Sequence, residues 1–424
     1  MRTRFSVSLL ALFAVTVGSL GVASESSAKA DGFEAHLKHL KAGKLAAGEK
    51  ALAAYLEENP EDDVARLELG ITQFLRTWEV VSSDLYQHGL RTDRIQMMPF
   101  GIRHRLPLHP DPKVLTAGGL REILQRMVND LTTAEATLAK ITSDDLKMEL
   151  PVEEIKLDLL GDGKPIPVKE MLMGLRNQRA RPNPMPVPPL PFVVAIDRGD
   201  VHWLRGYCHF LAGCGEVMLA HDGTEFFHRV GHLMFQRPDT PYDFIRDEVP
   251  DATFRFDTRQ ISDLIAAIHL LRFPIHEPNR MENALEHFEA MLAQSKIMWK
   301  HYQAETDDNR EWIPNPKQTG VLGVPVTQKM LDTWLETVTA AEEVLKGEKL
   351  VPFWRGKPRG DYGLNLRKVF TEPQELDLIL WVQGTAAAPY LEDGKVTPLA
   401  SPEHLQRINR DFGMSFFGFA VWFN

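Results

Sequence analysis

Imidazole side chains gather in residues 197–235, a stretch that contains five of the chain's fifteen histidines. Asp197 and Asp200 precede apolar residues with a helical period, and an aspartate there can accept hydrogen bonds from first-turn N–H groups. One side of the predicted helix carries a polar stripe: His202, Arg205, His209 and Glu216. The stripe predicts either a groove lined by two imidazoles, a guanidinium and a carboxylate, or the solvated face of an amphipathic helix, which is the favoured interpretation.

Glycines and cysteines on the same helix indicate how closely other parts of the protein pack against it. Gly206 and Gly213 lie beside the polar stripe. Because glycine costs a helix interior about 1 kcal/mol relative to alanine, they indicate close approach of another backbone or of a ligand. Cys208 and Cys214 are six residues apart, so their Cα atoms are about 9 Å apart, too far for a disulfide. We therefore expect both cysteines to be small buried apolar residues.

A second predicted helix follows the turn His221-Asp222-Gly223 and carries Glu225, His228 and His232 on one face. Two histidines four residues apart on a helix can bind one Zn²⁺, and the glutamate could add a carboxylate. With His202 and His209, these residues predict an alternative function, a metal-dependent hydrolase. The spacing is common and lacks the general-base glutamate of HExxH, so surface or hydrogen-bonded core histidines are favoured.

The segment DLLGDGK, residues 158–164, resembles the first half of an EF-hand calcium loop. The resemblance implies a weak Ca²⁺ site with four ligands: Asp158, Asp162, the carbonyl of Lys164, and either Glu170 or Glu154. Leu160 stands where a third oxygen ligand is expected, and Glu170 lies one place later than the bidentate glutamate of the family. An Asp-Gly turn between short segments is the alternative.

The run GKLAAGEKALAAYLEENPEDDVARLELG, residues 43–70, resembles a tetratricopeptide repeat. Gly43 stands at the turn between the paired helices, Pro60 at the end of the second, and Leu69-Gly70 open the next unit. No second full repeat follows, so we expect one helical hairpin packed on another part of the chain. Such a unit implies a protein partner on a helical surface. With WLRGYCH, LILWVQG and AVWFN, the chain is similar to uncharacterised exported bacterial proteins, a resemblance that implies no activity.

The beginning of the chain has the layout of a secretory signal peptide. A short basic region, residues 1–4, precedes an apolar run and then small residues ending at Ala30, so we expect residues 1–30 to be removed and the protein to be periplasmic or secreted. An uncleaved membrane anchor is the alternative. No later segment reaches the roughly 18 uncharged residues of a membrane helix. The net charge of −10, without a basic cluster, disfavours nucleic acid as a partner.

The rest of the pattern predicts a mostly α-helical protein, a multi-helical array with a small α+β part near the C-terminus. Residues 178–191, rich in proline, predict a linker between an N-terminal domain, residues 31–177, and a C-terminal domain, residues 192–424. Further helices are expected at 115–141, 258–272, 279–302 and 327–345, short strands within 363–370 and 376–382, and a buried closing segment at 412–423. We therefore expect an exported helical binding or scaffold protein, with a calcium-binding loop.

Overall fold

The computed structural model describes residues 37–92, 107–170, 191–246, 258–355, 361–413 and 416–423. The predicted signal peptide and residues 178–190 of the predicted linker lie outside these ranges. Within them the chain is mostly α-helical with small two- and three-stranded sheets, which confirms the predicted fold class.

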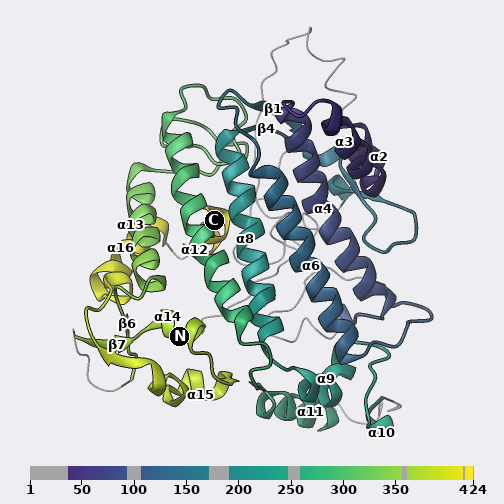
Figure 1. Cartoon of the computed structure of the whole chain (residues 1–424), viewed down its shortest axis with the longest axis vertical. Coiled ribbons are helices and arrows are strands. Elements are labelled where there is room, and N and C mark those ends of the chain that lie inside the picture. The colour runs from purple at the N-terminus through teal and green to yellow at the C-terminus, as the bar shows by residue number, and fades with distance from the viewer. Residues whose placement is uncertain are drawn as a thin grey trace.

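Four long helices stand side by side and form the centre of the molecule (Figure 1). They are α4 (Asp63–Gln87), α6 (Ala117–Leu138), α8 (Arg198–Ala220) and α12 (Asn279–Ala304). Neighbours run antiparallel: Arg121 at the start of α6 donates to the carbonyls of Leu219 and His221 at the end of α8. The predicted start of α8 is confirmed, because the Asp197 and Asp200 side chains form a reciprocal capping box with backbone N–H groups.

Glycine lets α8 approach its two neighbours closely. A Cβ on Gly213 would lie 2.9 Å from the ring of Phe288 on α12, and a Cβ on Gly215 would lie 2.5 Å from Val128 on α6. Both distances are too short for real side chains to keep their places. The structure therefore shows a close approach at Gly213, but its partner is the Phe288 side chain of α12 and not the backbone or ligand that the sequence predicted.

Smaller elements cover the two ends of the four helices. At one end, β1 (Lys147–Pro151) pairs with β4 (Val193–Asp197), which leads directly into α8. At the other end lie three short helices: α9 (Thr224–Val230), α10 (Asp243–Arg246) and α11 (Thr258–His269). There β5 (Arg272–Phe273) pairs with β8 (Leu376–Asp377), so the chain's later part is joined to this end.

The C-terminal part packs on α12 through α13 (Gln328–Leu345) and α14 (Leu366–Thr371). The other elements there are β6 (Val351–Pro352), β7 (Tyr362–Leu364), β9 (Leu391–Asp393), α15 (Leu378–Gln383), α16 (Pro402–Phe412) and α17 (Phe416–Phe423). The strands expected within 363–370 and 376–382 are present but end early, because Asn365 and Asp377 cap helices that begin at the next residue. The closing segment is buried in part: Phe412, Trp422 and Phe423 are buried, and the Phe423 ring lies 4.9 Å from that of Trp299, whereas Gly413 and Gly418 are exposed.

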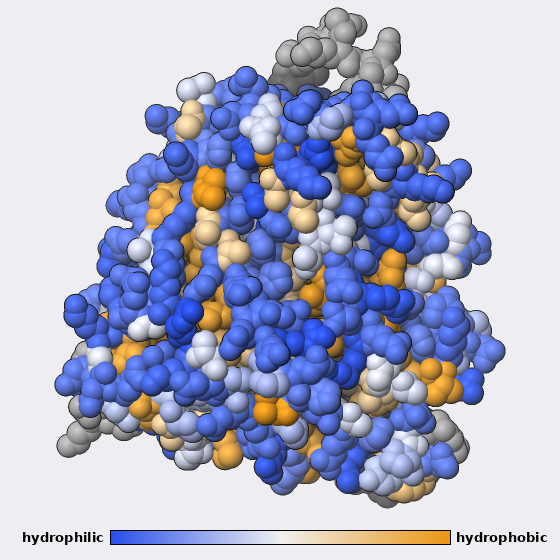
Figure 2. Space-filling view, viewed as in Figure 1, coloured by the Kyte–Doolittle hydropathy of each residue, from blue (hydrophilic) through white to orange (hydrophobic). Residues whose placement is uncertain are grey.

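The main hydrophobic core contains residues from Leu37 to Phe423, and three smaller clusters of buried residues accompany it in the described parts of the chain. It includes residues from both sides of the predicted linker, and β1 pairs with β4 across it. The predicted domain boundary therefore does not separate two cores. The face drawn in Figure 2 is mainly hydrophilic, with hydrophobic side chains in scattered groups. Among the described helices, none combines the length and the apolar character that crossing a bilayer requires.

The N-terminal helices form where the repeat resemblance placed them. The pair consists of α2 (Lys38–Ala42) and α3 (Leu45–Glu58), with Gly43 in the left-handed conformation between them. Leu69 and Gly70 lie inside α4 and do not open a new unit. A short helical pair of this kind is common outside repeat proteins, so the tetratricopeptide resemblance stays a prediction.

Candidate functional site

The polar stripe of α8 lies between α6 and α12. His202 is 4% exposed and Glu216 is 6% exposed. The solvated face favoured from the sequence is therefore wrong. The stripe lies in a groove in which His209 and Glu216 line a cavity, whereas His202 and Arg205 do not. Helical periodicity could not decide between them, because a polar stripe that meets water and one that meets polar neighbours have the same spacing.

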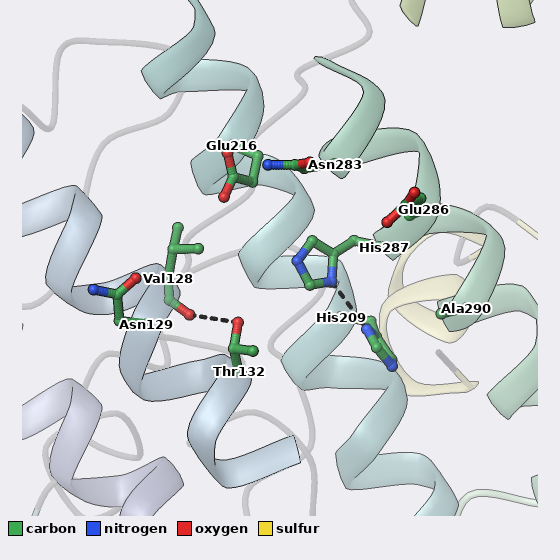
Figure 3. Close-up of a pocket in the computed structure, with 9 residues that line it drawn as sticks. All are labelled: Val128, Asn129, Thr132, His209, Glu216, Asn283, Glu286, His287 and Ala290. Carbon is green, nitrogen blue, oxygen red and sulfur yellow. Dashed lines mark hydrogen bonds between the residues drawn. The ribbon is translucent and has the colours of Figure 1, made fainter. Parts of the chain in front are cut away.

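A cavity of about 590 Å³ opens in this groove. Its described lining combines residues of all three helices: Val128, Asn129, Thr132, His209, Glu216, Asn283, Glu286, His287 and Ala290. Figure 3 shows Asn129 and Thr132 on one wall, Glu216 and His209 on the middle helix, and the α12 residues opposite. The lining includes two carboxylates and two imidazoles but no lysine or arginine. The volume is in the range that binds small molecules.

Ion pairs join α6, α8 and α12 next to the cavity. Arg280 Nη1 lies 3.0 Å from Glu216 Oε2, and Arg280 Nε lies 2.6 Å from Glu277 Oε2. Arg121 lies 2.5 Å from the other oxygen of Glu277. Burial opposes the charge of Arg280, but hydrogen bonds to Glu277 and Glu216 raise its pKa above the ordinary value. These contacts position Glu216 at one end of the cavity.

The two imidazoles of the cavity are hydrogen-bonded to each other, with 3.0 Å between His209 Nδ1 and His287 Nδ1. The other nitrogen of His209 lies 3.4 Å from Glu135 Oε1 on α6, and the same oxygen accepts from Arg205 Nε at 2.9 Å. Burial alone would raise the pKa of Glu135, but His209 and Arg205 lower it below the ordinary value. Burial lowers the pKa of His287.

His202 lies further along the stripe and has different partners. Its Nδ1 is 2.6 Å from Gln294 Oε1, and its ring stacks on that of His301 with centroids 5.3 Å apart. Burial, with a smaller contribution from nearby arginines, lowers the pKa of His202 to about 4. This histidine is therefore neutral at physiological pH and does not line the cavity.

The other residues of the predicted zinc site lie beyond the end of α8. His232 Nε2 is 3.1 Å from Asp263 Oδ2 on α11, and Glu225 pairs with Arg229 on its own helix. His228 follows Glu225 on α9. The imidazoles of His202, His209, His228 and His232 therefore do not converge on one point. In the described parts of the chain, the candidate metal ligands that do converge are carboxylates at the opposite end.

The loop predicted to bind calcium joins two strands, β2 (Lys156–Leu157) and β3 (Ile166–Pro167), whereas an EF-hand loop joins two helices. Asp158 accepts from the N–H groups of Asp162 and Gly163, and Asp162 accepts from that of Lys164. These bonds form an Asp-Gly turn, the alternative that the sequence offered. Glu170 is exposed just after β3. Calcium binding by this loop stays a prediction.

The converging carboxylates are an acidic cluster where α8 begins and α12 ends. One oxygen each of Asp197, Glu305 and Glu311 lies within 4.8 Å of the others. Asp200, beside them, accepts a 2.6 Å hydrogen bond from the hydroxyl of Tyr302. Three carboxylates are oxygen ligands of the kind that Ca²⁺ and Mg²⁺ prefer, although Ca²⁺ takes about six to eight oxygens.

Burial dominates the electrostatics of the acidic cluster. Together with the charge of Asp197, it raises the pKa of Asp200 well above the ordinary range. Burial and Asp197 raise the pKa of Glu305 to about 9, and burial raises that of Glu311 to about 7. Sequence reasoning identified Asp197 and Asp200 only as helix caps. No spacing signal links them to Glu305 and Glu311, which follow α12 more than a hundred residues later.

Comparison with known proteins finds no matching family model, no matching curated protein and no matching solved structure. The function must therefore be argued from the groove and the acidic cluster themselves.

Proposed function

We propose that the protein is an exported helical binding protein whose ligand site is the cavity between α6, α8 and α12. The observation that carries the proposal is the chemistry of this cavity: a space of about 590 Å³ lined by two carboxylates, two imidazoles and three other polar side chains. Export rests on the signal-peptide layout of residues 1–30.

The lining favours a small cationic ligand that donates hydrogen bonds. Glu286 contributes a carboxylate that attracts positive charge, and Glu216, whose charge is paired with Arg280, contributes a carboxylate that accepts hydrogen bonds. Thr132 donates its hydroxyl hydrogen to the carbonyl of Val128 at 2.9 Å, so its oxygen is left to accept. Because no lysine or arginine lines the described cavity, an anion would meet unfavourable charge there. An aliphatic amine provides both the positive charge and the N–H donors.

Calorimetry with three probes of equal length tests this: diaminobutane, butanediol and succinate. Diaminobutane should bind, and the diol and the diacid should bind much more weakly or not at all. Glu216→Gln and Glu286→Gln should each weaken diaminobutane binding about tenfold, because each removes one charge-assisted hydrogen bond. Glu282→Gln, on the exposed side of α12 and outside the lining, is the matched control and should not change the affinity. Preferred binding of succinate would contradict the proposal.

A further inference from the structure

Hydrogen bonds around the imidazole pair determine where the protons lie. Glu135 is a carboxylate that only accepts, and its Oε1 receives hydrogen bonds from Arg205. His209 Nε2 lies 3.4 Å from the same oxygen. A carboxylate requires a donor in that position, so Nε2 of His209 carries the proton. A neutral imidazole carries a single N–H group, so this tautomer leaves the Nδ1 of His209 as an acceptor.

The same reasoning continues to the second ring. Since His209 is protonated on Nε2, its Nδ1 has a lone pair and must accept across the 3.0 Å contact with His287 Nδ1. His287 therefore carries its proton on Nδ1, and its Nε2 is left as an acceptor. Burial lowers the pKa of His287, which keeps this ring neutral at physiological pH.

The acceptor nitrogen of His287 is directed into the cavity. Figure 3 shows one nitrogen of this ring toward His209 and the other turned away from it, toward the space between Thr132 and Glu216. That space belongs to the cavity, because all four residues line it. Glu135 does not line the cavity and acts on it only through His209.

We propose that Glu135 and His209 are positioning residues that present the bare Nε2 of His287 to the ligand as a hydrogen-bond acceptor. This inference rests on the proposed function, since it says how the same cavity selects a ligand that donates N–H groups. It assigns ligand selection to three hydrogen-bonded residues on three helices: Glu135 on α6, His209 on α8 and His287 on α12.

The test is nitrogen NMR of the imidazole rings in the full folded protein, which distinguishes the two neutral tautomers. In the wild type we expect His209 protonated on Nε2 and His287 protonated on Nδ1. Glu135→Leu removes the acceptor that holds the His209 proton on Nε2, so a measurable fraction of both rings should adopt the opposite tautomer. In that fraction His287 presents Nε2–H to the cavity, and the affinity for diaminobutane should fall about twofold or more. Glu122→Leu, an exposed substitution on the same helix, is the matched control.

The outcomes separate this inference from the proposed function. A wild-type spectrum with the His287 proton on Nε2 would overturn the inference without any variant, even if Glu135→Leu does not fold. Unchanged tautomers in a folded Glu135→Leu protein would also overturn it. If the tautomers are as expected but diaminobutane does not bind the wild type, the positioning of His287 is supported and the proposed function fails.

Discussion

Two buried polar regions lie on the same pair of helices, α8 and α12, and they differ in how their charges are balanced. In the groove, each carboxylate of the buried network faces a cation: Glu216 with Arg280, and Glu135 with Arg205. In the acidic cluster, Asp197, Glu305 and Glu311 face one another. The first arrangement can stay charged when it is buried, whereas the second must retain protons or take up a cation.

This difference has consequences for function and for stability. A groove whose ion pairs are already formed can offer a ligand fixed donors and acceptors, with little reorganisation on binding. The carboxylates of the acidic cluster have no such balance of charge, so their contribution to folding stability changes with pH and with bound cations. The groove is therefore the better candidate for recognition, and the cluster is the more sensitive to solution conditions.

The largest expected effect comes from breaking the balance in the groove. Arg280→Met should destabilise the protein by about 3 kcal/mol, because Glu216 is 6% exposed and would be left with a buried charge. Adding Glu216→Gln to this variant should recover much of the loss. Urea unfolding of the single and double variants measures both effects.

A surface ion pair gives the matched control for this double-variant experiment. Arg407 pairs with Glu336, and their side chains are 39% and 54% exposed. Arg407→Met should therefore change stability by less than about 1 kcal/mol. Equal losses at the two sites would show that burial does not distinguish the groove pair from a surface pair.

The acidic cluster predicts a pH dependence of the opposite sign from that of salt-bridged acids. The folded-state pKa values of Glu305, about 9, and Glu311, about 7, lie above those of the unfolded chain. The folded protein therefore binds protons that the unfolded chain has released. The associated stability is full below about pH 4.5 and is lost as pH rises toward 9, at up to about 1.4 kcal/mol per pH unit for each proton.

Glu305→Gln isolates this contribution, because the amide cannot ionise. The variant should show a flatter dependence of unfolding free energy on pH and should be more stable than the wild type by about 1 kcal/mol at pH 8. Chemical unfolding at a series of pH values measures the difference in unfolding free energy between the variant and the wild type. Glu282→Gln is the exposed control. A wild type whose stability rises between pH 5 and pH 8 would contradict the prediction.

Much of α8 could be predicted from sequence, including its capping aspartates, its polar stripe and the close approach at Gly213. These features are local, so periodicity and residue type determine them. The environment of the stripe was not predictable, because Glu135 and His287 lie on other helices, 70 and 78 residues from their partners Arg205 and His209. The acidic cluster has the same limitation: Glu305 and Glu311 resemble exposed loop acids until the fold brings them to Asp197.

The smallest expected effect is the change in stability on Ca²⁺ binding. Its measurement compares the acidic cluster with the 158–164 loop as candidate calcium sites. The sequence predicts weak binding at the loop, so millimolar Ca²⁺ should stabilise the protein by about 1 kcal/mol or less. Melting curves in Ca²⁺ and in chelator measure the shift at constant pH. Asp162→Ala should abolish it if the loop binds the ion, while Glu311→Gln should leave it unchanged. The reverse result would move the calcium site to the acidic cluster, where a cation would replace the retained protons and reduce the pH dependence of stability. No shift in the wild type would exclude stabilising calcium sites of millimolar affinity in both regions, because a ligand that binds only the folded state must raise the melting temperature.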